Sequence, residues 1–358
     1  LMQLQANKLI ELLEPLQPVI NDNHIIPVLR NVKIEIKDGF LTCSGDNTEV
    51  NVVNRLEFPV LDELSFCVNY QFLFKILKSL NKQDIELSLN NGVVFIKHKK
   101  GSFELPADNV SEFPIIKQEI YKNKATAVGS DLKSSLKVAT KFTLNSDLEA
   151  FSNVSIEINE SIKIRSTNKI TLFVDEVDGS GDPVHILISG QSCNALQSLI
   201  NDNKTEILYN DSSVFFKNDK TEVMIVQQNG NFPIDMFNKI IENGMNSSKL
   251  KVDFQDFITS IKRTSILSAK EKFSPLRLDI KDKKIEFSFD NVNSSSKANE
   301  TIKGKFKRDL LVGFDHRYLL EVLSVFESDS TFKIGENNFF CIQNGNKFGV
   351  LAPTQIQE

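Results

Sequence analysis

The chain has 358 residues, and its 41% hydrophobic and 25% charged composition is that of a globular protein long enough for sizeable cores. Its 42 basic residues against 47 acidic ones give a formal net charge of −5, which excludes a wholly basic nucleic-acid-coating protein but allows a local basic surface. No apolar run approaches the ~18 residues of a membrane span, so we expect none. The first residues, LMQLQANKLIELLE, lack the apolar run of a signal peptide, so we expect no export.

Four patterns follow one another along the chain, and the whole series then recurs twice. An amphipathic helix comes first, at Lys8–Val19, Asp131–Phe142 and Gln255–Leu267. A strand, a polar turn and a second strand follow, at Asn31–Ser44, Asn153–Ser166 and Pro275–Phe289. A second helix comes next, at Gln71–Leu80, Ser192–Asn203 and Arg317–Phe326. A three-strand meander with Asn, Gly and Asp turns ends each series, at Ile85–Leu105, Glu206–Val226 and Thr331–Leu351.

The period of this repeat is nearly constant. Equivalent strand positions recur every 122 residues, at Ile36, Ile158 and Ile280. The proline that closes each series recurs after 119 and then 120 residues, at Pro114, Pro233 and Pro353. Two independent landmarks with one period predict three tandem copies of an α+β domain, in which two helices bury one face on a mostly antiparallel sheet. We expect the copies at 1–117, 118–243 and 244–358.

Proline and cysteine positions give three smaller expectations. Pro15 and Pro18 should shorten or kink the first helix. The segments after Pro114 and Pro233 should be short linkers. The far-apart cysteines should be core thiols of a reducing cytoplasm, without disulfides or a CxxC metal site, and they are Cys43, Cys67, Cys193 and Cys341.

Basic residues form stripes on several predicted helices. The stripes comprise Lys75, Lys78 and Lys82 in copy one, Lys133, Lys137 and Lys141 in copy two, and Lys262 with Arg263 in copy three. For any single helix a solvated lysine face is the simpler interpretation. Recurrence on equivalent helices favours a surface that contacts phosphates loosely and without sequence preference, a role that suits the mobile point charge of lysine.

Motifs for catalysis are absent from the sequence. It contains no GxGxxG, GxxxxGK[ST], GxSxG or HExxH. The four histidines are scattered, and none lies at metal-ligand spacing from another histidine or a cysteine. We therefore expect a noncatalytic protein with no cofactor and no metal, and we rank an enzyme with an unrecognised site last.

Several segments, in the order and phase of the repeat, resemble the bacterial DNA polymerase III beta subunit, the replication sliding clamp. Segment 25–50, IIPVLRNVKIEIKDGFLTCSGDNTEV, resembles the first-domain signature of that family. Segment 265–280, SILSAKEKFSPLRLDI, is similar to its third-domain Ile-Leu-Ser stretch. Segment 314–328, FDHRYLLEVLSVFES, resembles its Phe-Asn-x-x-Tyr-Leu helix, so the resemblance covers essentially the whole chain.

This resemblance implies a function and a set of partners. Clamps have three such domains per chain, and two chains join head to tail into a six-domain ring whose helices line the hole. The chain would be a noncatalytic processivity factor of the bacterial cytoplasm that encircles double-stranded DNA without sequence preference. It would tether DNA polymerase and the clamp loader through clamp-binding peptides, and the lysine stripes would face the duplex.

The resemblance also assigns a dimer interface. The family uses an aromatic residue and a leucine on the last strand of domain one, which match Phe103 and Leu105. Their partners are an Ile-Leu pair of domain three, matched by Ile266 and Leu267. The alternative interpretation is that these four residues belong to the core.

The family's peptide groove, between domains two and three, is altered here. Its Thr-Asp-Gly-His-Arg-Leu loop corresponds to Thr167-Asn168-Lys169-Ile170-Thr171-Leu172, which keeps the threonine and leucine but loses the His-Arg pair. Its Met-Pro-Met-Arg-Leu end corresponds to Ala352-Pro353-Thr354-Gln355-Ile356, which keeps the proline. The remaining wall positions of the groove are Phe151, Pro233, Phe237, Val350 and Leu351. Because methionine repacks easily against many partners, its loss predicts a divergent clamp with narrower or shifted peptide specificity.

A second interpretation keeps the fold but not the ring. The altered groove, and Asn23-His24 where the family often presents a basic DNA contact, are compatible with an interaction scaffold that does not encircle DNA. The two interpretations differ in whether the chain dimerises and remains on circular DNA.

Overall fold

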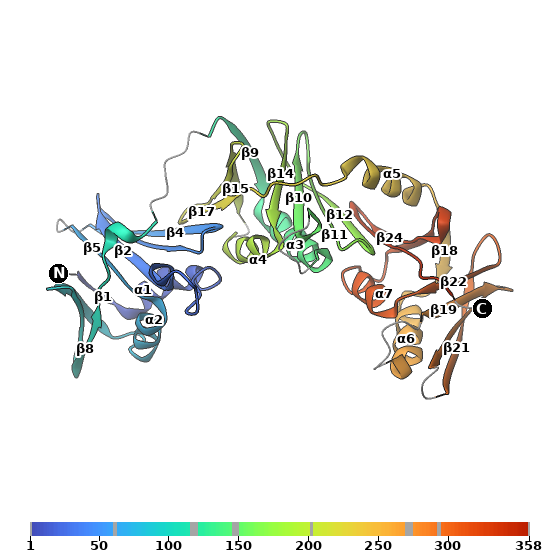
Figure 1. Cartoon of the computed structure of the whole chain (residues 1–358), viewed down its shortest axis with the longest axis horizontal. Helices are drawn as coiled ribbons and strands as arrows, with labels where there is room; N and C mark the ends of the chain where they lie inside the picture. Colours follow the sequence, from blue (N-terminus) through green and yellow to red (C-terminus); the bar gives the residue numbers. More distant parts are fainter. Residues whose placement is uncertain are drawn as a thin grey trace. The chain divides into compact units, whose positions relative to one another are not determined.

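The computed structural model describes residues 2–59, 63–114, 121–144, 150–200, 203–268, 275–291 and 295–356. The chain, coloured along the sequence in Figure 1, divides into two compact units. Unit 1 comprises residues 1–137, 157–162 and 178–228, and unit 2 comprises residues 138–156, 163–177 and 229–358. The second sequence repeat is therefore shared between the units, and the domain boundaries expected at 117 and 243 stay a prediction.

Unit 1 contains two sheets and the first helices of the chain. One sheet has the order β1-β6-β7-β8, with bounds Met2–Gln5, Asp84–Asn90, Val93–His98 and Gly101–Pro106. The other has the order β13-β9-β15-β16-β17-β4-β3-β2-β5, with bounds Gly179–Gly181, Asn123–Val128, Lys204–Tyr209, Ser213–Lys217, Thr221–Val226, Val50–Glu57, Phe40–Asp46, Asn31–Lys37 and Leu64–Asn69. The other elements are α1 (Ala6–Leu13), α2 (Tyr70–Ser79), most of α3 (Gly129–Ala139), β14 (Val184–Ser189) and α4 (Gly190–Leu199).

Unit 2 contains one long run of paired strands. Its order is β11-β12-β25-β24-β23-β18-β21-β20-β19-β22, with bounds Ile162–Thr167, Thr171–Val177, Lys347–Leu351, Phe340–Asn344, Thr331–Ile334, Ser248–Val252, Ser296–Lys305, Lys284–Asn291, Leu276–Lys281 and Leu310–Phe314. Strand β10 (Asn153–Ile158) lies mostly in unit 2. The helices of this unit are α5 (Ile234–Met245), α6 (Phe254–Thr264) and α7 (His316–Leu323).

The predicted series of elements is confirmed. The strand–turn–strand patterns become antiparallel hairpins such as β2–β3 and β19–β20. The three meanders become β6–β7–β8, β15–β16–β17 and β23–β24–β25. The first helix ends at Leu13 and passes into a 3-10 turn, Glu14–Leu16, that contains Pro15, so the effect expected of this proline is also confirmed.

Of the two predicted linkers, the one after Pro114 lies largely outside the described residues, and the prediction of a linker after Pro233 is wrong. The segment after Pro233 forms α5, which buries Phe237, Ile241 and Gly244 at i, i+4 and i+7. The helical spacing is present in the sequence, where Phe237, Ile240 and Ile241 lie at i, i+3 and i+4. A Cβ atom at Gly244 would lie 2.7 Å from Cζ of Phe348, so the close packing of α5 on β25 leaves no room for a side chain.

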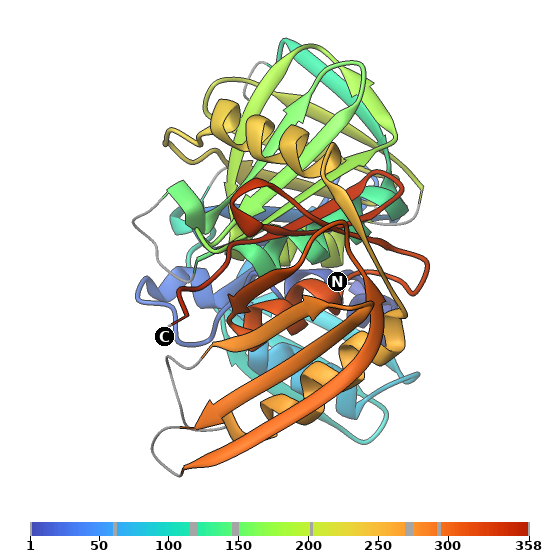
Figure 2. The ribbon, with the colours of Figure 1, turned by 90° about the vertical axis from the view of Figure 1, so that its right-hand side faces the viewer.

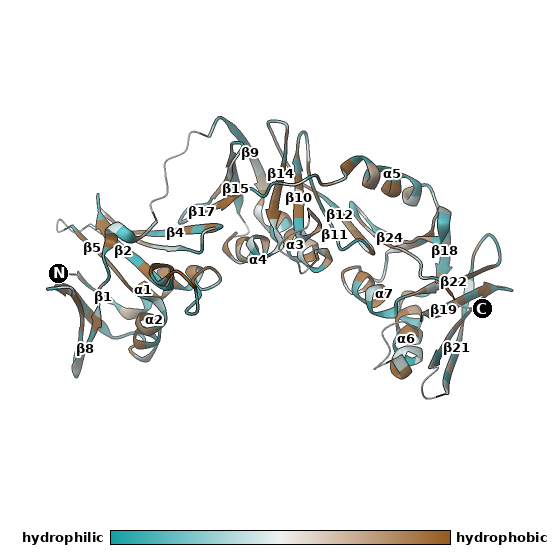
Figure 3. Cartoon of the chain, in the orientation of Figure 1, coloured by the Kyte–Doolittle hydropathy of each residue, from teal (hydrophilic) through white to brown (hydrophobic). Residues whose placement is uncertain are grey.

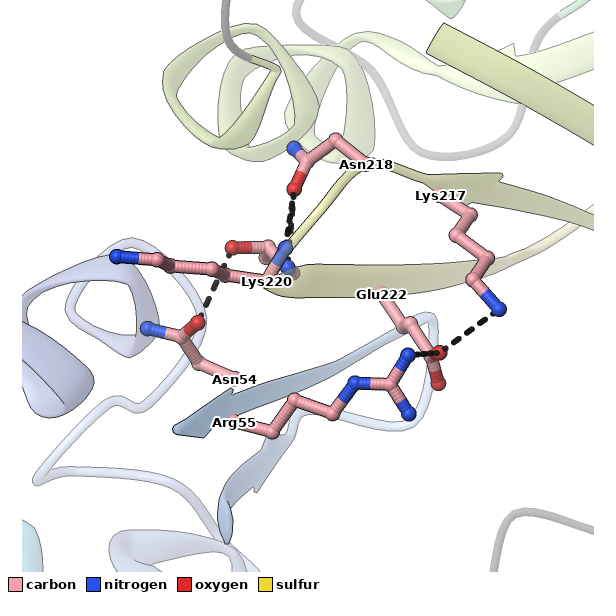
Figure 4. A network of polar contacts seen from close by, with 7 residues as sticks. Asn54, Arg55, Lys217, Asn218, Lys220 and Glu222 are labelled. Carbon is pink, nitrogen blue, oxygen red and sulfur yellow. Dashed lines mark hydrogen bonds and ion pairs between the residues drawn. The ribbon is translucent and has the colours of Figure 1, made fainter. Parts of the chain in front are cut away.

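Strand pairing joins two repeats within unit 1. Strand β4 of the first repeat pairs with β17 of the second, and the Thr221 hydroxyl donates to Oδ1 of Asn54 at 3.2 Å. Next to Thr221, Glu222 Oε1 lies 3.2 Å from NH2 of Arg55 and 3.5 Å from Nζ of Lys217 (Figure 4). Within unit 2, β12 of the second repeat pairs with β25 of the third in the same antiparallel manner.

The core of unit 2 centres on Phe257 of α6. This fully buried ring lies 5.3 Å from Phe287, 5.1 Å from Phe332 and 5.9 Å from Phe340, measured between ring centroids. The helices that pack on the sheets are amphipathic. Figure 3 shows apolar and polar residues mixed along α2 and α6. Phe257 therefore links the helix to the central strands of the sheet.

Replacement of Phe257 by alanine should remove this link. We expect Phe257→Ala to lower the free energy of unfolding of unit 2 by about 3 to 5 kcal/mol, because it deletes a fully buried ring and leaves a cavity. Urea unfolding followed by far-ultraviolet circular dichroism measures the change. The matched control is Phe72→Ala, because Phe72 is 60% exposed, and its effect should stay within about 0.5 kcal/mol. Equal losses for the two variants would contradict this account of the core.

Candidate functional site

The basic residues predicted to face DNA lie on or beside helices, as expected. Lys75 and Lys78 are exposed on α2, whose other face buries Leu73 and Leu77. Lys82 is exposed just after this helix, with a left-handed backbone (φ 64°). Lys133 is half-buried on α3, while Lys137, Lys141, Lys262 and Arg263 are exposed. Their contact with DNA stays a prediction.

Several of these cations already have acidic neighbours. Lys78 Nζ lies 2.5 Å from Oε1 of Glu14 and 5.0 Å from the centroid of the Phe74 ring. Arg263 NH1 lies 2.9 Å from Oε1 of Glu300 on β21. Sequence reasoning missed both pairs because each acid belongs to a different element, 64 and 37 residues away from its partner. The pairs are exposed and hydrated, so each contributes at most about 1 kcal/mol to stability and can exchange for a phosphate.

Lys141 has an acidic neighbour in unit 2 as well. Burial raises the pKa of the Glu321 carboxyl on α7, and the positive charge of Lys141 opposes that rise. The basic surface is therefore partly neutralised at this position.

The predicted dimer residues of unit 1 differ in exposure. Phe103 of β8 is 36% exposed and stacks on His98, with ring centroids 5.7 Å apart. Leu105 of the same strand is only 9% exposed, so it supports the sheet from within the unit. Strand β8 is the last strand of its sheet among the described elements, and its outer edge has no partner strand there.

The predicted dimer residues of unit 2 lie in the 3-10 turn Ser265–Ser268, which packs beside β21. Ile266 is 70% exposed, and Leu267 is half-buried. Among the described strands, residues 297–303 of β21 pair with β20 on one side only, because β18 reaches β21 only at residues 304 and 305. Unit 2 therefore also combines an exposed apolar side chain with an open strand edge, within its described residues.

The predicted peptide-groove residues lie around the β12–β25 pairing of unit 2. The turn from Thr167 to Thr171 is held by Asn168, whose Oδ1 accepts hydrogen bonds from the backbone N–H of Ile170 at 3.0 Å and of Thr171 at 2.7 Å. Lys169 adopts the left-handed conformation (φ 74°) that this turn requires. The backbone N–H of Ala352 donates to the carbonyl of Ile170 at 2.9 Å, so the segment after β25 lies against the turn.

An aromatic cluster lies in the same unit. Phe237 on α5 packs at 5.3 Å from Phe232 and at 6.5 Å, edge to face, from Phe151. The ammonium of Lys169 lies 5.3 Å from the centroid of the Phe151 ring, a cation–π contact. These contacts bring together Phe151, Lys169 and Phe237, which are far apart in the sequence.

The apolar wall expected for the groove is mostly buried. Leu172, Phe237, Val350 and Leu351 are all 5% exposed or less, so they are primarily core residues of unit 2. Phe151, Pro233, Ala352 and Pro353 are half-buried, Thr167 and Thr171 are buried, and Lys169, Ile170 and Thr354 are exposed. The backbone N–H of Thr354 donates to the carbonyl of Gly313 at 2.8 Å, which fixes the segment after Pro353 to β22. A ligand here would meet the half-buried and exposed members, and the groove stays a prediction.

The described residues offer little chemistry for catalysis. They contain no group of three or more His, Cys, Asp and Glu side chains that could hold a metal ion. All four cysteines are buried and free, and burial raises the pKa of Cys67 and of Cys341 to about 12. No helix within the described ranges is long and apolar enough to cross a membrane.

A serine–histidine contact is the nearest approach to a catalytic pair. Ser268 Oγ lies 2.8 Å from Nε2 of His316. The same hydroxyl donates to the carbonyl of Ser265 at 2.6 Å, so it accepts from the histidine, and Nδ1 of His316 has no hydrogen-bond partner among the described residues. Burial lowers the pKa of His316. With the imidazole as donor and no group to orient it, this contact is structural.

Asn168 should determine the shape of the exposed turn. Asn168→Ala removes the acceptor shared by two backbone amides, and we expect a loss of about 1 to 3 kcal/mol in local stability with faster amide exchange at residues 169–171. Asn168→Asp keeps an oxygen acceptor and is the matched control. Hydrogen exchange by mass spectrometry distinguishes them, and equal protection in both variants would contradict the role of this side chain.

Comparison with known proteins gives matches along nearly the whole chain. The family model for the DNA polymerase III beta subunit, N-terminal domain, matches residues 2–117, and that for its C-terminal domain matches residues 244–339. The protein called "Beta sliding clamp" of Rickettsia bellii is 24% identical over 346 residues, covering 91% of this chain and 90% of that protein. The protein of the same name from Staphylococcus aureus is 20% identical over 333 residues, covering 87% and 86%.

Solved structures with similar folds are also clamps. A sliding clamp from Pseudomonas aeruginosa bound to griselimycin superposes with a TM-score of 0.91 at 19% identity, covering 99% of both chains. A DNA polymerase sliding clamp from Bacillus subtilis gives a TM-score of 0.89, also at 19% identity and 99% coverage of both chains. The predicted fold class, three tandem clamp domains of the α+β type, is thereby confirmed.

Proposed function

Because the chain belongs to the DNA polymerase III beta subunit family, as a divergent member, we propose that it acts as a DNA sliding clamp. Two copies would close into a ring around double-stranded DNA. The ring would hold DNA polymerase and other replication or repair proteins on their template, in the cytoplasm, as a noncatalytic accessory subunit without a cofactor. The observation that carries this proposal is that the family's first and last domains match in order, with a clamp fold over the whole chain.

The charge distribution supports enclosure of DNA more than tight binding. The chain is acidic overall, with a net charge of −5, while Lys75, Lys82 and Lys262 are exposed on or beside helices. Scattered lysines attract phosphates weakly and with strong salt dependence, and they read no base sequence. A ring that must move along DNA needs this combination, because topology holds it in place while weak contacts let it slide.

Two open strand edges support ring closure. Strand β8 carries exposed Phe103, and β21 lies beside exposed Ile266. An unpaired edge is a template for a strand of another chain. We assign the subunit contact to antiparallel pairing of β8 of one copy with β21 of the other. Exposed Phe103 and Ile266 would form its apolar centre, with smaller contributions from Leu105 and Leu267, which are less exposed.

The partner site is assigned to the groove residues of unit 2. Its exposed and half-buried members, among them Phe151, Lys169, Ile170, Ala352 and Thr354, would contact a peptide, while Leu172, Val350 and Leu351 would hold the wall in shape. The small side chains of Ala352 and Thr354 favour a narrower set of peptides than a methionine-lined groove accepts. A scaffold that binds such peptides without encircling DNA is the second candidate, and the altered groove is the observation that favours it.

Retention on circular DNA tests the leading proposal. We expect the protein, loaded passively on a nicked circular plasmid, to elute with the DNA on gel filtration and to be lost once the plasmid is cut to a linear form. Linear DNA of the same length and sequence is the control. Equal retention on both forms, or on neither, would favour the scaffold.

The subunit contact makes a separate prediction. Light scattering should give twice the 40.5 kDa mass of the chain. Phe103→Ala and Ile266→Ala should each weaken the dimer by about 2 kcal/mol, because each truncates an apolar residue at the centre of the proposed contact. Leu311→Ala, at a residue that is 55% exposed elsewhere in unit 2, is the matched control and should leave the mass unchanged. A wild-type chain that stays monomeric at micromolar concentration would refute the assignment.

The peptide groove can be tested by calorimetry with a peptide that carries a standard clamp-binding motif. We expect weaker binding than to a methionine-lined clamp, and about tenfold tighter binding after the double change Ala352→Met and Thr354→Met, which restores apolar side chains that can repack. Lys239→Met, on the exposed face of α5, controls for a general gain of apolar surface. Tight binding by the unmodified chain would contradict altered specificity.

A further inference from the structure

Five lysines gather around a shallow hollow in unit 2. The hollow has a volume of about 490 Å³ and is lined by Asp282, Gly304 and the five lysines, which we call the lysine cluster: Lys251, Lys283, Lys284, Lys303 and Lys305. All five side chains belong to exposed residues. In a chain with more acids than bases, this is a local concentration of positive charge.

Strand register places four of these lysines on one face of the sheet. Lys251 of β18 lies directly opposite Lys305 of β21, and Lys284 of β20 lies directly opposite Lys303 of β21. Directly opposite residues of an antiparallel pair share a face, and so do residues two apart on one strand. Lys283 joins them from the β19–β20 turn, where its backbone carbonyl accepts from the N–H of Gly304 at 3.0 Å.

This face points away from α6. Along β21 exposed residues alternate with half-buried ones, and the alternate set includes Glu300, which pairs with Arg263 of α6. Lys303 and Lys305 belong to the exposed set. Figure 2 shows β20 and β21 in front of α6, so it views the face that carries the cluster. The cluster is therefore separate from Lys262 and Arg263, which we assigned to the encircled duplex.

Acidic groups neutralise the cluster only in part. Asp282 lines the same hollow, and Glu286 is exposed two residues after Lys284 on β20. The carboxylates farther along the strands have other partners, since Asp279 pairs with Lys281 at 2.7 Å and Asp290 with Lys297 at 3.8 Å. Within the described part of the chain, no carboxylate lies within ion-pair distance, 4.0 Å, of any of the five. Like charges directly opposite one another destabilise a sheet, and this site has two such pairs on adjacent strands. An arrangement that costs stability in the free protein becomes favourable when an anion binds.

We propose that the lysine cluster binds the phosphate backbone of a nucleic-acid strand that is not enclosed by the ring. The inference extends the proposed function, because DNA outside the ring would then be close to this face. Lys303 and Lys305 are about 7 Å apart along β21, and strands lie about 4.8 Å apart, so the ammonium groups can reach successive phosphates of one strand. Lysine is a mobile point charge, which suits a phosphate chain whose position varies.

A protein partner fits this surface less well. Protein interfaces depend on aromatic or arginine anchors that fill pockets, and the hollow is lined by lysine stems, one aspartate and one glycine. It offers no aromatic ring on which a base could stack and no amide side chain that could read a base edge, so binding would be electrostatic and independent of sequence.

The test is fluorescence anisotropy with a labelled single strand of about 20 nucleotides, measured between about 50 and 200 mM salt. The variant K251Q/K284Q/K305Q, which leaves the open edge of β21 unchanged, should bind about tenfold more weakly at the lower salt concentration. The slope of log affinity against log salt should fall by about 2, because each phosphate contact on a single strand contributes about 0.7. The matched control, K37Q/K220Q/K239Q, removes the same charge from exposed lysines elsewhere and should bind like the unmodified chain.

Two further measurements separate this inference from the proposed clamp function. Retention of the cluster variant on circular plasmid should match that of the unmodified chain, whereas a failure of the clamp proposal itself would remove retention from both. Its melting temperature should be equal or higher, because two like-charge pairs are lost.

Three results would overturn the inference. The cluster variant and the control could bind the strand equally well. A polyglutamate peptide of equal charge could displace the strand more readily than unlabelled DNA does, which would indicate an acidic protein as the partner. The cluster variant could lose dimer mass in light scattering, which would assign the lysines to the subunit contact.

Discussion

Backbone hydrogen bonds between strands of different repeats hold each unit together. In unit 1 the pairing joins residues 50–54 of β4 to 221–225 of β17, and in unit 2 it joins 171–174 of β12 to 348–351 of β25. The second pairing also shapes the candidate partner site, because it sets the exposed turn at Ile170 beside Ala352. The same pairing buries Leu172, Val350 and Leu351. One contact between strands therefore both joins the two repeats and forms the buried wall of the candidate site.

Elements that depend on local pattern were predictable from the sequence. The strands around Ile36, Ile158 and Ile280 alternate with period 2 and carry polar turns, so the repeat emerges from their spacing. Helix α5 carries the same kind of signal, with Phe237, Ile240 and Ile241 at i, i+3 and i+4, and the linker prediction disregarded it. Only the glycine at position 244 could not be explained from the sequence, because the ring of Phe348, 104 residues away in β25, occupies the space of a side chain there.

Site residues were harder to predict than strands for the same reason. A row of lysines in the sequence shows which face of a helix is basic, but it does not show which other residues lie against that face. Lys78, for example, pairs with Glu14, which lies just after α1. The lysine cluster was missed because its members are split among three strands and one turn, each with only one or two of them. Register, which aligns Lys251 with Lys305 and Lys284 with Lys303, converts dispersed charges into a patch. Unit 2 thus has two separate basic groups: the lysine cluster on one face of its sheet, and Lys262 with Arg263 on helix α6 at the opposite face.

The pairing of β4 with β17 has a consequence for how the chain can be divided. A fragment cut at the end of the first repeat would leave one edge of residues 50–54 with its amide and carbonyl groups unsatisfied, and the complementary fragment would leave residues 221–225 in the same state. Such unpaired strand edges are templates for other strands, so isolated repeats should be prone to aggregate. Unit 1 therefore behaves as one folding unit across the boundary between two repeats, although its sequence is modular.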